Sequence, residues 1–240
     1  MKSRSTSNFV GTLSKIKNEL NDELSINQTE KLSESKVGKL ADFLASEYIE
    51  FKGKKFRINS TINSLKSCME YDYSDLRSSD IVLDLGACCG AFSILVSDRV
   101  NKIYAVEPLF SDLILENLFL NKIYNIFILP YALAPTSCWL HLRYDPRINT
   151  VPARPFEWFL DMPNIHFDFL KMDVEMAEWC ITSDNLRDFR RLEIEVHNFD
   201  GKHNIENFET IVKNAGFEYI TDTIKGSPTH IIHGFNKGIK

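Results

Sequence analysis

The sequence lacks the cysteine spacings of zinc-binding and redox motifs. None of its five cysteines forms a C-x-x-C pair, and Cys88 and Cys89 are direct neighbours, which suits an ordinary structural disulfide poorly. This pattern gives no support to a zinc site or a thioredoxin-like motif. We expect reduced thiols in a cytoplasmic protein.

Long apolar runs and an excess of basic residues are also absent. No stretch approaches the roughly 18 consecutive apolar residues of a transmembrane helix. The segment 1–20 lacks the apolar run of about 7–15 residues that a secretory signal needs. The net charge of −5 offers no broad basic face for nucleic acid. We therefore expect neither a membrane nor a nucleic acid as partner.

The first part of the chain has the pattern of a helical cap. Two apolar stripes recur every three or four residues, as in amphipathic helices. The stripes comprise Phe9, Leu13, Ile16, Leu20 and Leu24, then Val37, Leu40, Phe43, Leu44 and Ile49. Residues 51–58 resemble a hairpin turning at Gly53, and Ile62, Leu65 and Met69 indicate a short helix. We predict a mainly helical cap over residues 1–78, whose helices could pair in a homodimer, and a catalytic domain over 79–240.

From Asp80 onward, strands alternate with helices. The predicted strands are Ile81–Leu85, Ile103–Val106, Ile126–Leu129, Phe167–Met172 and Leu192–Val196, with helices over 90–99, 111–121 and 176–188. Buried strands joined by helices predict an α/β fold with parallel strands and right-handed crossovers. A helix over Ile205–Ala215 precedes two runs, Phe217–Thr221 and Thr229–His233, which predict a closing antiparallel hairpin.

The segment Val82–Gly90 (VLDLGACCG) carries a D-x-G-x-x-x-G pattern between a strand and a helix. Gly86 allows the backbone to approach a ligand closely, and the next helix begins with free N–H groups. Glu107 ends the following strand, where a carboxylate can accept hydrogen bonds from ribose hydroxyls. The alternative is an ordinary strand-to-helix turn followed by a surface glutamate.

These features separate two nucleotide-like cofactors. A dinucleotide fingerprint, G-x-G-x-x-G, requires glycine at positions 86, 88 and 91. The chain has Cys88 and Ala91 at the last two, and a side chain at the second obstructs a pyrophosphate. S-adenosylmethionine has no phosphate, so the pattern favours it over NAD.

Charged residues at the ends of the fourth and fifth strands indicate an acceptor site. Asp173 and Glu175 follow the fourth strand, where ligands of open α/β sheets bind. Glu178 falls in the first turn of the next helix, where a carboxylate favours the helix dipole. On the fifth strand, Glu193, Glu195 and His197 share one face.

His197 or Asp173 could accept a proton as general base. His197 could instead only cap its strand. A magnesium ion held by Asp173 with Glu195 or His197 is a further alternative, although we predict a site without metal.

Together these motifs resemble the FkbM family of S-adenosylmethionine-dependent methyltransferases. The matching blocks are VLDLGACCGAFS, YAVEPLFSDLILENLFLN, DFLKMDVEMAEW and LEIEVHNF, across residues 80–222. The resemblance implies a class I methyltransferase (Rossmann-like) fold with a seven-stranded, mostly parallel sheet and a C-terminal antiparallel hairpin. It also implies methyl transfer to a hydroxyl of a sugar or small metabolite.

Site residues follow from the same resemblance. It implies cofactor contacts at Asp84, Gly86, Ala87, Gly90 and Glu107, and an acceptor side formed by Asp173, Glu175 and His197. Two positions depart from the family pattern, because Cys88 replaces an asparagine and Met176 replaces a glycine.

These departures leave two other readings open. One is a non-catalytic protein that keeps the fold. The other is a nucleic-acid or protein methyltransferase, although the fourth strand is followed by DVEM and lacks the N-P-P-Y-like motif of base amino-methylation.

Overall fold

A seven-stranded sheet forms the centre of the fold. The computed structural model describes residues 48–57, 62–144, 147–198, 203–224, 226–236 and 238. The strands are β3 (Ile81–Leu85), β4 (Lys102–Val106), β5 (Ile126–Leu129), β9 (Phe169–Met172), β10 (Arg191–His197), β11 (Glu218–Thr223) and β12 (Thr229–Phe235). They lie in the order β11-β12-β10-β9-β3-β4-β5, in which β12 pairs antiparallel with both β10 and β11 and all other pairs are parallel. This is the class I methyltransferase arrangement, which confirms the predicted fold and its closing hairpin.

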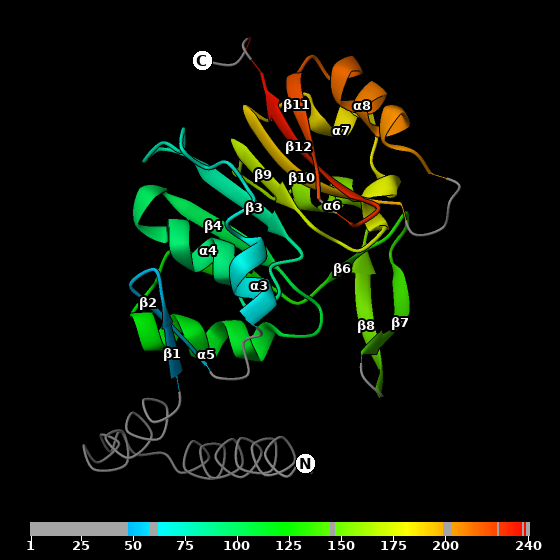
Figure 1. Ribbon diagram of the computed structural model, residues 1–240. Helices are drawn as coiled ribbons and strands as arrows, with labels where there is room; N and C mark the ends of the chain where they lie inside the picture. Colours follow the sequence, from blue (N-terminus) through cyan, green and yellow to red (C-terminus); the bar gives the residue numbers. More distant parts are fainter. Residues whose placement is uncertain are drawn as a thin grey trace, which may run out of the picture. The chain divides into compact units, whose positions relative to one another are not determined.

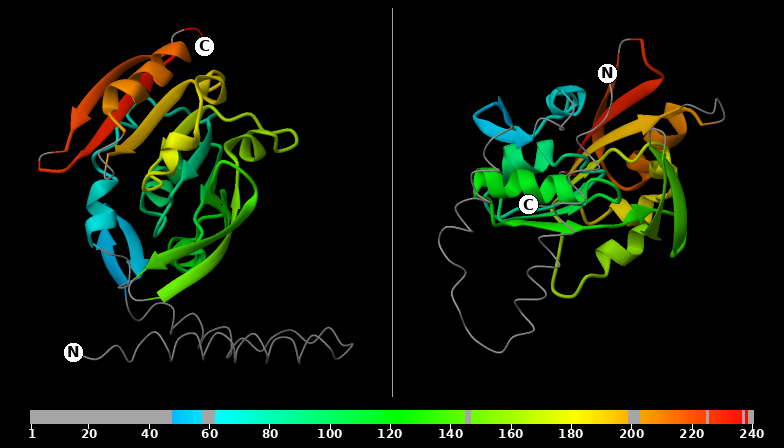
Figure 2. Two further views of the ribbon diagram at one scale, coloured as in Figure 1. Left: turned by 90° about the vertical axis from the view of Figure 1, so that its right-hand side faces the viewer. Right: turned by 90° about the horizontal axis from the view of Figure 1, so that it is seen from below.

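Helices cover both faces of this sheet (Figure 1, Figure 2). The helices are α4 (Ala91–Val96), α5 (Ser111–Asn121), α6 (Phe156–Leu160), α7 (Ser183–Leu186) and α8 (Ile205–Asn214). Strand β3 contributes to two cores, since Val82 packs with the side chains of α4 and α5, and Leu83 with those of α6, α7 and α8. Successive side chains of a strand point to opposite faces, so one run of apolar residues serves both layers. Among the described helices, none is long and apolar enough to cross a membrane.

The helix predicted over 176–188 is two short pieces. A 3-10 turn, η2 (Ala177–Cys180), ends before Ile181, and α7 begins after Thr182. Thr182 and Asn185 form a capping box, which starts a new helix. The prediction of one continuous helix is wrong because apolar spacing alone did not reveal this cap.

A second sheet, absent from the prediction, lies between β5 and β9 in the chain. Its strands are β6 (Ala132–Leu133), β7 (Cys138–Tyr144) and β8 (Arg147–Arg154), in the order β6-β8-β7. Strands β7 and β8 form a long ribbon that extends away from the main sheet (Figure 1). This ribbon supplies one wall of the cavity described below.

The hairpin predicted at Gly53 is confirmed as β1 (Tyr48–Phe51) and β2 (Lys54–Arg57). Ile49, predicted on a helical stripe, lies in β1, and Met69 follows the helix α3 (Ile62–Ser67) instead of belonging to it. The rest of the predicted cap helices, and any homodimer through them, fall outside the described residues. The domain boundary at residue 78 stays a prediction.

Candidate functional site

A cavity of about 860 Å³ opens at the carboxyl ends of β3, β4, β9 and β10. Ligands of open α/β sheets bind at this edge. Five predicted site residues line the cavity: Gly86, Ala87, Glu107, Asp173 and Glu175. The other three, Asp84, Gly90 and His197, are buried and do not line the cavity.

The turn after β3 is held against the neighbouring strands. The amides of Gly86 and Ala87 both donate to the carbonyl of Val106, at 2.9 and 3.1 Å. Gly86 has a φ of +76°, and a Cβ there would lie 1.7 Å from the carbonyl oxygen of Asp173. The expected reason for this glycine was the approach of a ligand. The structure shows a different one, because the backbone after β9 occupies that space.

Asp84 supports this turn from below. Its carboxylate is wholly buried, accepts the hydroxyl of Ser93 at 2.6 Å, and lies 3.3 Å from the Lys171 ammonium. Lys171 also donates to the carbonyl of Gly86 at 2.8 Å. Burial alone would lower the pKa of Lys171, but the negative charges of Asp84 and Asp173 raise it, so the amine stays charged. Asp84 therefore acts on the turn through Lys171, a residue that no sequence motif indicated.

Glu107 presents its carboxylate to the cavity wall. Its Oε1 accepts the amides of Leu109 and Phe110, at 2.7 and 3.2 Å, and its Oε2 accepts the amide of Cys88 at 2.9 Å. A carboxylate can accept about four hydrogen bonds, so one site remains, on Oε2. Burial raises the pKa of Glu107 to about 7.

A group of carboxylates surrounds the buried ring of His197 on the other side of the cavity. The Nε2 atom lies 3.8 Å from Asp173 Oδ1, 3.7 Å from Glu175 Oε2 and 3.5 Å from Glu195 Oε1. The shared face predicted for Glu195 and His197 is confirmed. Burial raises the pKa of Asp173 to about 6.

The other ring nitrogen of His197, Nδ1, contacts Glu178. The Oε1 atom of Glu178 accepts the backbone amide of His197 at 2.6 Å and lies 3.1 Å from Nδ1. Glu178 lies in the first turn of η2, as expected, and its wholly buried side chain also contacts β10. Burial lowers the pKa of His197, but its hydrogen bonds with Glu178 and Glu195 outweigh this and raise it to about 10.

Tyr71, which no motif indicated, completes this group. Its hydroxyl donates to Glu195 Oε2 at 2.9 Å and lies 3.5 Å from Asp173 Oδ2. The other oxygen of each carboxylate is the one nearer His197 Nε2. Tyr71 thus orients both carboxylates, although it lies about a hundred residues earlier in the chain.

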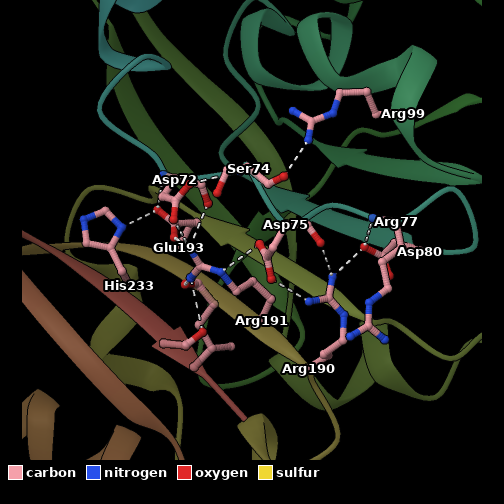
Figure 3. Close-up of polar contacts among 12 residues, drawn as sticks. Asp72, Ser74, Asp75, Arg77, Asp80, Arg99, Arg190, Arg191, Glu193 and His233 are labelled. Carbon is pink, nitrogen blue, oxygen red and sulfur yellow. Dashed lines mark hydrogen bonds and ion pairs between the residues drawn. The ribbon is translucent and has the colours of Figure 1, made fainter. Parts of the chain in front are cut away.

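An ionic network holds the segment that carries Tyr71 (Figure 3). Arg191, wholly buried in β10, pairs with Glu193 at 2.5 Å and with Asp72 and Asp75 at 3.2 Å. The amide of Asp72 donates to Glu193 Oε2 at 2.8 Å. In the same network Arg190 pairs with Asp75 and Asp80, and His233 with Glu193. These contacts fix residues 72–80 against β10 and so determine where Tyr71 lies.

No family model matches the chain, and no curated protein matches it in sequence. Several solved structures are similar in fold. One is the precorrin-6y C5,15-methyltransferase of Geobacter metallireducens GS-15, with 14% identity, 79% of this chain and 97% of that chain covered, and a TM-score of 0.47. A second is TYW2 of M. jannaschii in complex with AdoMet, with 15% identity, 79% and 85% covered, and a TM-score of 0.49. A third is an rRNA methylase of Streptococcus thermophilus, with 10% identity, 74% and 93% covered, and a TM-score of 0.46. The fold class rests on the strand order and helical layers given above.

Proposed function

We propose that this chain is an S-adenosylmethionine-dependent methyltransferase that methylates a hydroxyl oxygen of a sugar or small metabolite. One observation carries the proposal. A single cavity on a class I methyltransferase sheet has the glycine turn and Glu107 on one side and a group of carboxylates on the other. The first side suits a nucleoside, and the second suits a hydroxyl that must lose a proton.

The cofactor would bind beside β3 and β4. The free acceptor site on Glu107 Oε2 suits one ribose hydroxyl, since the other sites already accept backbone amides. Leu109 and Phe110 follow Glu107 along the cavity wall and offer apolar surface for the adenine ring. Cys88, which replaces the family's asparagine, also lines the cavity, with its amide directed at Glu107.

Methyl transfer would proceed by in-line displacement. Bound S-adenosylmethionine would supply the methyl group: the acceptor oxygen would form the new C–O bond as the C–S bond breaks, with S-adenosylhomocysteine as the leaving group. Asp173 takes the hydroxyl proton, because its carboxylate lines the cavity whereas His197 does not. Alignment can contribute about 7–11 kcal/mol, and proton removal about 10²–10⁴-fold in rate.

Two measurements test the proposal. Calorimetry with S-adenosylmethionine should show saturable micromolar binding, and E107A should weaken it. Incubation of a metabolite extract with methyl-labelled S-adenosylmethionine should then produce a labelled hydroxyl product, scored by mass. If the wild type binds no cofactor, the proposal fails. If it binds but transfers no label to any extract tested, a non-catalytic binding protein is the better account.

We also propose a cytoplasmic location. None of the five cysteines forms a disulfide in the structure, and Cys68 and Cys89 are buried. Reduced thiols are the rule in that compartment.

A further inference from the structure

We infer that Asp173, Glu175 and His197 bind a divalent metal ion at the acceptor end of the cavity, with Glu195 as an additional ligand. The role of this ion in catalysis rests on the proposed function, but its binding does not. The four side chains come from the end of β9, the turn after it, and β10.

The ligand atoms are already close to a coordination geometry. Oxygens of Asp173, Glu175 and Glu195 lie 3.5–3.8 Å from His197 Nε2, and one ligand atom each of Asp173, Glu175 and His197 all lie within 4.8 Å of one another. An ion with bonds of about 2.1 Å places neighbouring ligand atoms roughly 3.0–3.4 Å apart. The carboxylate oxygens would have to approach His197 Nε2 by a few tenths of an ångström, and the ligand atoms that lie up to 4.8 Å apart would have to approach each other by more. The carboxylates of Asp173, Glu175 and Glu195 line the cavity, which leaves the open positions of the ion facing a substrate.

Groups behind the ligands orient them as in known metal sites. A metal-binding histidine almost always has its second ring nitrogen bonded to a carboxylate, carbonyl or water. Here Glu178 Oε1 lies 3.1 Å from His197 Nδ1 and accepts the His197 amide as well, which directs Nε2 at the other carboxylates. Tyr71 contacts Asp173 Oδ2 and Glu195 Oε2, so the Oδ1 and Oε1 atoms are the ones presented to the ion.

The local charge also calls for a cation. The carboxyl groups of Asp173, Glu175, Glu178 and Glu195 surround one imidazole ring. Lys171, a neighbouring cation, acts against burial to lower the pKa of Asp173 and of Glu195. Its ammonium makes its direct contacts, however, with Asp84 and the carbonyl of Gly86. A protonated His197 supplies one positive charge, whereas a divalent ion supplies two at the centre of the group.

The donor set indicates the class of metal. Carboxylates suit magnesium and manganese, and an imidazole nitrogen suits first-row transition ions. A mixture of the two points to Mn²⁺ or a similar ion. In the proposed reaction, such an ion would bind the acceptor hydroxyl and lower its pKa. Asp173 Oδ1 would coordinate the ion while Oδ2 accepts the proton.

The test is a titration of the metal-stripped, full-length protein with Mn²⁺ alone, following the loss of the free-ion signal by electron paramagnetic resonance. We expect one saturable site per chain. Glu175→Gln is the main variant, since its side chain is 76% exposed and the change leaves the core untouched. It should weaken binding at least tenfold. Glu178→Gln should weaken it about 10–100-fold, as loss of an outer partner does. Glu206→Gln, an exposed glutamate of α8, is the matched control and should bind like the wild type.

The outcomes separate this inference from the proposed function. No Mn²⁺ binding at millimolar concentration, with S-adenosylmethionine still bound, overturns the metal site and leaves the methyltransferase in place. Equal weakening by Glu175→Gln and Glu206→Gln also overturns it, because the ion would then be held by general surface charge. A specific Mn²⁺ site in a protein that binds no S-adenosylmethionine supports the metal site and rejects the proposed function.

Discussion

The two sides of the cavity differ in the polar groups that they present. The side formed by β3 and β4 has one carboxylate, Glu107, and a turn whose amides bond to backbone and to that carboxylate. The side formed by β9 and β10 has three carboxylates around a buried histidine, backed by Glu178 and Tyr71. The first side can hold a ligand by shape and a single strong hydrogen bond. The second has the charges that move protons or bind cations.

This contrast predicts that substitutions on one side should leave the other side's task intact. Gly86 is the exception, since its turn touches the backbone after β9. The following experiments test the division, beginning with that exception.

Gly86→Ala should have the largest effect. Its Cβ would lie 1.7 Å from a backbone oxygen of Asp173, so either the turn or the end of β9 must move. We expect cofactor affinity to fall at least about 1,000-fold, or roughly 4 kcal/mol, as measured by calorimetry. Gly53→Ala is the control, because it has a similar φ of +75° but no atom within 4 Å of the added Cβ. It should cost about 1 kcal/mol of stability and no affinity. If Gly86→Ala folds and binds S-adenosylmethionine with wild-type affinity, the contact between this turn and the backbone after β9 does not affect cofactor binding.

Asp173→Asn should show the difference between the two sides most clearly, because it should change kcat but not cofactor affinity. Removing the proton acceptor should lower kcat about 100-fold or more, while the affinity for S-adenosylmethionine changes less than about threefold. Steady-state rates and calorimetry on the same preparation measure both. Asp184→Asn, an exposed aspartate of α7, is the control and should match the wild type. A large loss of cofactor affinity in Asp173→Asn would place the cofactor on both sides of the cavity.

The same contrast explains how far the sequence could predict this site. Gly86 and Glu107 follow buried strands at short spacing, so a local pattern locates them. The main sheet was predictable for the same reason, because each strand is a short apolar run. Tyr71 and Lys171 gave a weaker signal. Lys171 stands inside a buried strand, which is unusual for a lysine, but the position of Tyr71 depends on ion pairs with a strand about 120 residues later.

The second sheet was missed for a different physical reason. Strand β6 has two residues, and β7 has exposed Trp139 and Tyr144, so neither forms a buried apolar run. Strand β7 is held in place by its pairing with β8 across the ribbon, and no local sequence pattern indicates this pairing.

The Glu107 carboxylate should give the cofactor side its own pH dependence. Its pKa is raised to about 7 by burial, so the form that accepts a ribose hydroxyl becomes common only as the pH rises through 7. Affinity for S-adenosylmethionine should increase about tenfold from pH 6 to pH 8. Glu107→Gln should bind more weakly at pH 8 and lose this dependence.

The free energy of unfolding of the cofactor-free protein should instead decrease as the pH rises. A folded-state pKa above the ordinary 4.5 means that the folded protein holds a proton that the unfolded chain releases. Without cofactor, this carboxyl therefore costs stability as the pH rises from about 4.5 to 7, and Glu107→Gln should remove that cost in urea unfolding. A flat wild-type affinity between pH 6 and pH 8 would contradict the assignment of Glu107 to the ribose.

A substitution in the ionic network behind the acceptor side, His233→Gln, should have the smallest effect, a change in the free energy of unfolding. The hydrogen bond to Glu193, 2.8 Å long, raises the pKa of His233 above the ordinary 6.5. The stability from this pair is fully present below pH 6.5 and is lost as the pH rises through the raised value. His233→Gln should therefore lower the free energy of unfolding by about 1 kcal/mol at pH 5.5 and by less at pH 8.5, measured with urea. His141→Gln, an exposed histidine that contacts Thr150, should show no such difference.

Because Glu193 also holds the amide of Asp72, next to Tyr71, His233→Gln should disturb the acceptor side alone. An accompanying fall in cofactor affinity would mean that the network supports both sides of the cavity.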